Sequence, residues 1–189
     1  MTAFTSNGTG GGDWNALATW TNGVNYPFEL SAADTFTIAA GDTITTTADN
    51  PFAGTGAGSI SGTLICNHNG SAQNFCGAIT TNSGGTLSSA SNQNTKVLRA
   101  AGNVTIAAGG TYHGYEDFTL IIASTGVGTY TFTNAVDANF YMVGSSGHVS
   151  RIQGDGSGKE MKCVIYGGSV TAIIHIDYAD FQWGVHIDA

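Results

Sequence analysis

The stretch FTIAAGDTIT, Phe36 to Thr45, returns later in the chain as VTIAAGGTYH, Val104 to His113. In each copy apolar residues alternate with threonine around an Ala-Ala-Gly segment, and alternation with period two is typical of a strand with one buried face. Glycine in the middle segment supplies a turn conformation that other residues resist. Each copy therefore predicts two strands joined by a turn, with Ile38 and Ile106 in the core and the threonines outside.

Spacing along the chain predicts how these strands assemble. Apolar clusters, marked by Ile38, Ile60, Ile79 and Leu98, recur roughly every 19 to 24 residues, a period typical of a solenoid. In a solenoid, stacked coils bury one another's apolar faces. We predict an all-β fold, a parallel β-helix in which Ile106 repeats Ile38 after three coils of about 22 to 23 residues each. A β-sandwich is the alternative, because it also uses short strands and turns.

Composition supports strands and limits the partners. Only 10% of residues are charged, and Gly, Thr, Ser and Asn disfavour helix interiors. The net charge is −8, and too few basic residues are present to neutralise nucleic acid phosphates or bind an anionic membrane. No apolar run is long enough for membrane insertion, and the N-terminus lacks the features of a signal peptide. We therefore expect a neutral or cationic partner. The five basic residues are Lys96, Arg99, Arg151, Lys159 and Lys162.

The two ends of the chain differ from its middle. The segment GGDWNALATWTNGVNYP concentrates two of the three tryptophans, and a solenoid needs a cap over its first open edge. We predict that residues 1–50 form this cap and the first rung, with Trp14, Leu17 and Trp20 closing the mouth; an aromatic sugar-binding platform is the alternative. Residues 51–189 form the remaining rungs. The C-terminal stretch has no polar cap, so we expect that end to be truncated or covered by a partner.

The segment GGDWNALATWTNGVNYP, together with the later ADTFTIAAGDTIT, resembles the N-terminal region of many phage virion and bacterial surface proteins. Those are right-handed parallel β-helix proteins of the pectate-lyase-like type. The resemblance covers roughly Gly11 to Thr47, and the later strands match only in style. It implies a non-catalytic structural or receptor-binding protein of a virion, a fibre, spike or decoration protein at the virion or extracellular surface. It also implies a homo-oligomer, often a trimer, that contacts other virion proteins or a cell-surface glycan. A secreted bacterial adhesin is an alternative.

A histidine and aspartate cluster near the C-terminus is the first candidate for chemistry. The tripeptide His-Ile-Asp occurs twice there, at positions 175–177 and 186–188. Histidine and aspartate on either side of one residue in a strand point to the same side, so the four side chains could ligate a divalent cation or share a proton. The alternative is that they are outward polar residues flanking Ile176 and Ile187, with no cofactor. The four candidates are His175, Asp177, His186 and Asp188.

A second candidate is the stretch GSSGHVSRIQG, which contains His148 and Arg151. It faintly resembles the Gly-His-Gly and Arg-Ile-Lys elements of polygalacturonase-like enzymes. Those enzymes carry the two elements on separate segments and add paired aspartates as acid and base. Here the elements are fused, Gln153 stands in place of the lysine, and no adjacent aspartate pair occurs. We therefore favour a protein without catalytic activity, with a polysaccharide lyase or glycoside hydrolase of the β-helix type as the alternative.

The three cysteines, Cys66, Cys76 and Cys163, are too few for a disulfide framework. We expect them to be small buried apolar residues. Two alternatives remain open, a Cys66–Cys76 bridge and a zinc site that combines these two cysteines with His68.

Overall fold

The computed structural model describes residues 2–21, 23, 26–27, 29–30, 33–47, 53–54, 56–68, 74–122, 130–154, 161–165, 173–177 and 179–182. In these residues the fold is all-β, and every pairing between strands is parallel. A short 3-10 turn, η1 (Leu17–Thr19), lies near the N-terminus. Within the described residues, no helix is long and apolar enough to cross a bilayer.

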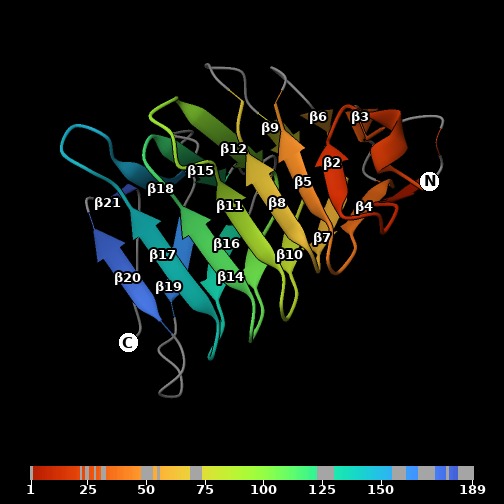
Figure 1. Ribbon diagram of the computed structural model, residues 1–189. Coiled ribbons are helices and arrows are strands. Elements are labelled where there is room, and N and C mark those ends of the chain that lie inside the picture. The colour runs from red at the N-terminus through yellow and green to blue at the C-terminus, as the bar shows by residue number, and fades with distance from the viewer. Residues whose placement is uncertain are drawn as a thin grey trace.

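Seven strands form the first sheet, called sheet 1, and seven form the second, called sheet 2 (Figure 1). Sheet 1 contains, in spatial order, β1 (Ala3–Thr5), β4 (Thr35–Ile38), β7 (Ala57–Ile60), β10 (Ile79–Thr81), β13 (Val104–Ile106), β16 (Tyr130–Asn134) and β19 (Met161–Ile165). Sheet 2 contains β2 (Gly11–Asp13), β5 (Thr43–Thr46), β8 (Thr63–Cys66), β11 (Thr86–Ser89), β14 (Thr111–Gly114), β17 (Asn139–Val143) and β20 (Ile174–Asp177).

A third sheet and a two-stranded pairing complete the described strands. Sheet 3 contains β9 (Asn74–Cys76), β12 (Lys96–Ala100), β15 (Phe118–Ile122), β18 (Ser150–Gly154) and β21 (Ala179–Gln182). The short pairing joins β3 (Glu29–Leu30) and β6 (Ala53–Gly54).

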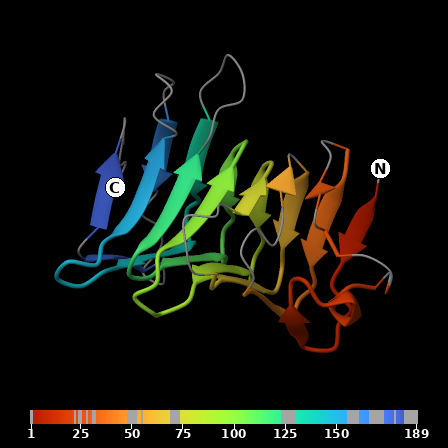
Figure 2. The same ribbon diagram turned by 90° about the horizontal axis from the view of Figure 1, so that it is seen from above.

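Consecutive strands lie in different sheets. The chain runs from β7 in sheet 1 to β8 in sheet 2 and β9 in sheet 3, and then returns to sheet 1 as β10. From β7 on, each circuit adds one strand to each sheet, and in the first two circuits β3 and β6 pair with each other instead of joining sheet 3. Strands of successive circuits therefore lie side by side (Figure 2). This order is compatible with a parallel β-helix. It differs from a β-sandwich, which is built from antiparallel strands.

The repeated phrase occupies equivalent places in this arrangement. Ile38 pairs with Ile60, Ile60 with Thr81, and Thr81 with Ile106. The two copies are therefore separated by three strand-to-strand steps in sheet 1, as the sequence predicts. Both isoleucines of the phrase are fully buried, and the adjacent Thr37 and Thr105 are only half-buried.

Two of the four residues that mark the apolar clusters in the sequence do not occupy the same place in successive circuits as Ile38 and Ile60. Ile79 is equivalent to Phe36 and Gly58 instead of to Ile38, and Leu98 lies in β12 of sheet 3. One circuit contributes up to three strands, each with its own apolar cluster. Successive clusters therefore do not mark successive circuits, and the shorter spacings between clusters underestimate the true period.

Inward side chains form rows that cross the strands, and each row must fill the core without clashes. One row of sheet 1 runs through Phe36, Gly58, Ile79, Val104 and Phe132. A Cβ atom added at Gly58 would lie 2.1 Å from Cζ of the Phe36 ring. The large ring thus requires the absence of a side chain on the next strand, because protein cores have almost no spare volume.

The Ala-Ala-Gly segments form turns at the corner between sheets 1 and 2. The Asp42 N–H donates to the Ala39 carbonyl, and the Gly110 N–H donates to the Ala107 carbonyl. Gly41 and Gly109 adopt positive φ angles of 86° and 74°, a region that favours glycine. These turns stack closely on one another. A Cβ atom at Gly110 would lie 3.0 Å from the Asn82 carbonyl oxygen of the previous circuit.

The second circuit has Asp42 where this later turn has Gly110, and the carboxylate binds the N-terminal segment. Asp42 is only 1% exposed, and its two oxygens accept hydrogen bonds from the N–H groups of Gly8 and Gly10, each at 2.9 Å. Burial on its own raises the pKa of Asp42, but hydrogen bonds from Ser6, Gly8 and Gly10 stabilise the carboxylate and leave the pKa below its usual value. Asp42 therefore anchors the segment before β2.

Aromatic rings fill the N-terminal end of the core. Trp14 and Trp20 are buried, with ring centroids 5.0 Å apart, and Trp14 also lies edge-on to Phe36. The Trp20 Nε1–H donates to the Trp14 carbonyl, and the Trp14 Nε1–H donates to the Pro27 carbonyl. Leu17 is 45% exposed, so its side chain lies outside this packing.

We predict that Asp42→Asn lowers the free energy of unfolding by about 1.5–3 kcal/mol at neutral pH, because hydrogen bonds to a charged acceptor are lost. The folded-state pKa lies below the unfolded value of 3.8. The stabilisation is therefore present above that value and lost as pH falls through the folded pKa. The difference between wild type and variant in urea denaturation should shrink in acid. Exposed Asp177, replaced by Asn, is the control, and a constant difference at every pH would contradict this account.

Candidate functional site

The outer face of sheet 2 carries a row of side chains that are distant in sequence. Because the strands pair in register, equivalent residues of successive circuits lie next to one another at about the strand spacing of 4.8 Å. The row begins with Asp13, continues with small and aliphatic residues, and ends with aromatic rings and histidines. Its members, in order, are Asp13, Thr45, Ile65, Ser88, His113, Tyr141 and His175.

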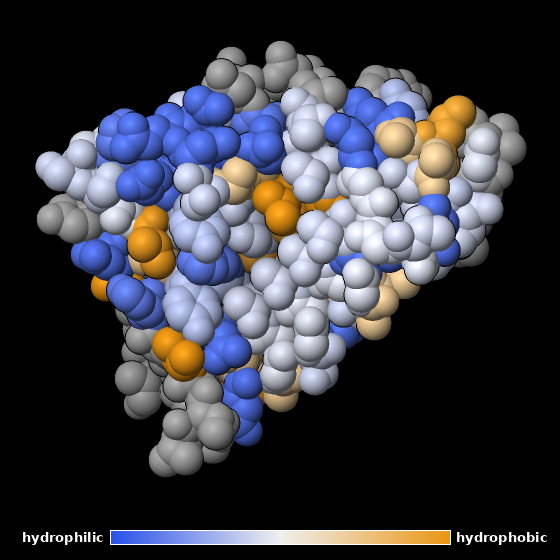
Figure 3. All heavy atoms as spheres, in the orientation of Figure 1, coloured by the Kyte–Doolittle hydropathy of each residue, from blue (hydrophilic) through white to orange (hydrophobic). Residues whose placement is uncertain are grey.

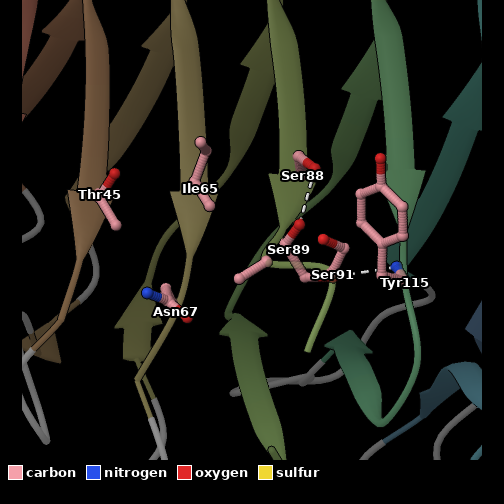
Figure 4. A pocket seen from close by; sticks show the side chains of 8 residues that line it. Thr45, Ile65, Asn67, Ser88, Ser89, Ser91 and Tyr115 are labelled. Carbon is pink, nitrogen blue, oxygen red and sulfur yellow. Dashed lines mark hydrogen bonds between the residues drawn. The ribbon is translucent and has the colours of Figure 1, made fainter. Parts of the chain in front are cut away.

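A shallow hollow of about 410 Å³ lies on this face (Figure 4). Strands β5, β8 and β11 form its floor, and Tyr115, which follows β14, lies at one end. Figure 3, seen from the same side as Figure 1, shows mixed polar and apolar residues across this face of the molecule. The lining residues are Thr45, Ile65, Asn67, Ser88, Ser89, Ala90, Ser91 and Tyr115.

The lining combines polar side chains with the apolar Ile65 and Ala90, and it contains no charged residue. Thr45, Ser88 and Ser91 supply hydroxyl groups, Asn67 supplies an amide, and Tyr115 supplies an aromatic ring. Hydroxyls and amides can both donate and accept hydrogen bonds. This set therefore suits a neutral ligand rich in hydroxyl groups, and it offers no cation to neutralise an anionic one.

Local hydrogen bonds fix the shape of the hollow. The Tyr115 N–H donates to Ser89 Oγ at 2.9 Å, and the Ser88 hydroxyl donates to the Ser89 carbonyl at 3.0 Å. The Asn92 side chain donates to Asn67 Oδ1 at 2.8 Å. Three successive circuits are thus connected around the hollow, and a preformed site loses less entropy when it binds a ligand.

A stack of rings continues from the hollow along sheet 2. His113 and Tyr115 are stacked with centroids 3.9 Å apart, and His113 lies 4.8 Å from Tyr141. Burial lowers the pKa of His113, and the nearby His175 lowers it further. His113 is therefore neutral at neutral pH. Since His113 covers one face of the Tyr115 ring, only the opposite face can stack on a ligand.

Sequence reasoning missed these rings as a site. His113 and Tyr115 belong to TYHGY, where alternate residues of a strand point outward. That alternation was the available signal. It could not show that Ser88 and Tyr141, each a full circuit away from His113 along the chain, lie beside it.

His148 has a partner that the sequence did not suggest. Its Nδ1 lies 2.6 Å from Asp117 Oδ2, and the side chains are 35% and 20% exposed. Both residues lie at the corner between sheets 2 and 3, and Asp117 has a positive φ of 54°. Arg151, the other candidate in that stretch, lies in β18 and is half-buried. An imidazole oriented by a carboxylate at Nδ1 keeps Nε2 for proton transfer.

The C-terminal histidine and aspartate set is only partly described. His175 and Asp177 lie exposed in β20, and Ile176 between them is also 41% exposed, whereas the sequence placed it inward. Strand β20 lies at the end of the described part of sheet 2, so no further strand there covers it. His186, Ile187 and Asp188 lie outside the described residues. Among the described residues, no group of three His, Cys, Asp or Glu side chains could hold a metal ion.

The cysteines are buried free thiols, and no Cys66–Cys76 bridge is present. Burial raises the pKa of Cys66 and of Cys163 to about 12. His68 is buried as well, and its Nε2 accepts a hydrogen bond from the Val97 N–H at 3.3 Å. These residues therefore serve the core, and the zinc alternative has no support from their geometry.

Comparison with known proteins gives no match. No protein family, no curated protein and no solved structure is significantly similar to the chain. Function therefore has to be argued from the geometry of the site.

We predict that His113 titrates below the ordinary histidine value of 6.5 in a nuclear magnetic resonance titration of the ring protons. Burial is the larger cause, so His175→Asn should raise the pKa of His113 only slightly. Single histidine substitutions assign the signals. A wild-type His113 pKa at or above the ordinary histidine value would contradict this account, because it would show that the ring is hydrated instead of buried.

Proposed function

We propose that the chain is a right-handed parallel β-helix and a non-catalytic structural or receptor-binding protein of a phage virion, a fibre, spike or decoration protein. Its outer sheet 2 face binds a neutral glycan of the cell surface. The three parallel sheets, visited in turn by the chain, support the β-helix. The resemblance of the N-terminal segment supports the virion role and a trimeric homo-oligomer.

The observation that carries the glycan contact is the uncharged hollow that ends at Tyr115. A sugar ring presents an apolar face of C–H groups and a rim of hydroxyls. The face of Tyr115 that is turned away from His113 matches the apolar face of the sugar, because aromatic rings contribute large apolar contact areas. The hydroxyls of Ser88 and Ser91 and the amide of Asn67 can form hydrogen bonds with the hydroxyl rim of the sugar. The net charge of −8 disfavours acidic sugars.

We predict that a glycan array finds neutral oligosaccharides, and that titration calorimetry shows Tyr115→Ala to weaken the best ligand by roughly tenfold or more, as the loss of about 1.4 kcal/mol would do. Tyr115→Phe keeps the ring and should retain most of the affinity. Thr105→Ala, on the outer face of β13 in sheet 1, is the matched control. Preference for sulfated or carboxylated glycans, or equal losses for Tyr115→Ala and Thr105→Ala, would refute the site.

The pair of His148 and Asp117 favours a second candidate, a polysaccharide-cleaving enzyme of the β-helix type. A carboxylate at Nδ1 fixes the imidazole so that Nε2 can act as a general base. On this reading, polysaccharide incubated with the protein is shortened, and His148→Ala lowers the rate by roughly a hundredfold or more. Size-exclusion chromatography of the polysaccharide measures the shortening. Intact polysaccharide after prolonged incubation with the wild type would remove this candidate.

A further inference from the structure

Lys96 is the most unusual polar residue of the core. It stands at the start of β12, its side chain has no exposed surface, and it is one of the five basic residues of the chain. Buried lysines are rare because removing an ammonium group from water is costly unless strong partners compensate. The proposed glycan contact does not use this residue, so its burial needs another explanation.

The partner of Lys96 is a carboxamide in the same corner. Lys96 Nζ lies 2.7 Å from Asn92 Oδ1 and also donates to the Asn92 backbone carbonyl. The Asn92 amide is fixed from its other side, because its Nδ2 donates to Asn67 Oδ1 at 2.8 Å. An amine hydrogen-bonded to a fixed amide oxygen lies next to the carbon that it would attack, an arrangement that greatly accelerates reaction.

The surroundings also favour a neutral, nucleophilic amine. Burial lowers the pKa of Lys96, although the nearby carboxylates of Asp117 and Glu116 oppose this effect. The Lys96 N–H donates to the Asp117 carbonyl, so the two residues are backbone neighbours. Asp117 in turn contacts His148, which is 35% exposed. A carboxylate near the amine and a histidine that reaches solvent can accept and pass on a proton.

We propose that Lys96 and Asn92 join in an intramolecular isopeptide bond, formed by the folded chain without any added reactant. Lys96 gives up a proton to Asp117, and the Nζ lone pair attacks Asn92 Cγ to form a C–N bond. A second Nζ proton passes to Nδ2, the Cγ–Nδ2 bond breaks, and the departing ammonia takes the first proton from Asp117 and leaves as ammonium. The ammonium of Lys96 and the carboxamide of Asn92 thus become one secondary amide and one ammonium ion, with no change in oxidation state.

Such a bond would explain why this corner contains a buried lysine. It closes a ring over residues 92–96, which span the second half of the β11–β12 connection and the first residue of β12. It also replaces a costly buried charge by a neutral amide. The inference shares Asn67 with the proposed glycan contact, but it concerns a different reaction and is tested by a different measurement.

The test is the intact mass of the folded wild-type chain, followed by digestion with trypsin after denaturation. We expect the mass to fall short of the sequence mass by one ammonia molecule. Trypsin needs a free lysine, so cleavage after Lys96 should be lost and one peptide should run on to Arg99. A wild-type chain with its full sequence mass that trypsin cuts after Lys96 would overturn the proposal and leave only a hydrogen bond.

Variants separate this bond from other losses of ammonia, such as succinimide formation at an asparagine. Lys96→Arg and Asn92→Ala should both have their full sequence masses. Asn92→Asp should lose one water molecule instead, because a carboxylic acid condenses with an amine that way. Asp117→Asn should lower the joined fraction at least tenfold, while Glu116→Gln, the matched control, should react fully. Ammonia loss that persists in Lys96→Arg would assign it to another site and refute the bond.

Discussion

Parallel pairing in register is the constraint on which the rest of the structure depends. It places each side chain beside the equivalent residue of the next circuit, so that neighbours in space recur along the chain once per circuit. Inside, this pairing sets Gly58 against the ring of Phe36. Outside, it produces a row of hydroxyls in sheet 1, formed by Thr37, Ser59, Thr80, Thr105 and Thr133. Both the core and the surface are therefore built from rows that cross the strands. The side chain at one position limits which side chains fit beside it on the next strand.

Polar chemistry is distributed unevenly over this frame. At the N-terminal end, buried Asp42 replaces the glycine of later turns and binds the preceding segment through two backbone N–H groups. At the corner between sheets 2 and 3 lie Lys96, Asp117 and His148, each with a polar partner. The hollow of sheet 2 lies next to that corner and is uncharged. The charged and neutral sites are thus adjacent, but they rely on different residues.

The sequence was informative where the pattern is local. Alternation in FTIAAGDTIT predicted the strands, the turn and the buried Ile38, and the second copy predicted an equivalent place three steps away. The period was harder to read, because Leu98 belongs to a third sheet whose apolar cluster resembles those of the other two. The candidate site was out of reach for a physical reason. Tyr115 and Asn67, or His148 and Asp117, come together only through the register of strands, which no single stretch of sequence encodes.

The connections between sheets show where the chain can change in length. Residues 82–85, 107–110 and 135–138 form turns of four residues, whereas the turn between β7 and β8, residues 61–62, has two. The Asn82 carbonyl oxygen lies against Gly110 of the next circuit, so these two turns pack closely. The connections between sheets 2 and 3, residues 90–95, 115–117 and 144–149, already differ in length. Connections beside the hollow can therefore change in length without any shift of register. Such changes would alter the rim of the hollow while the paired strands keep their register.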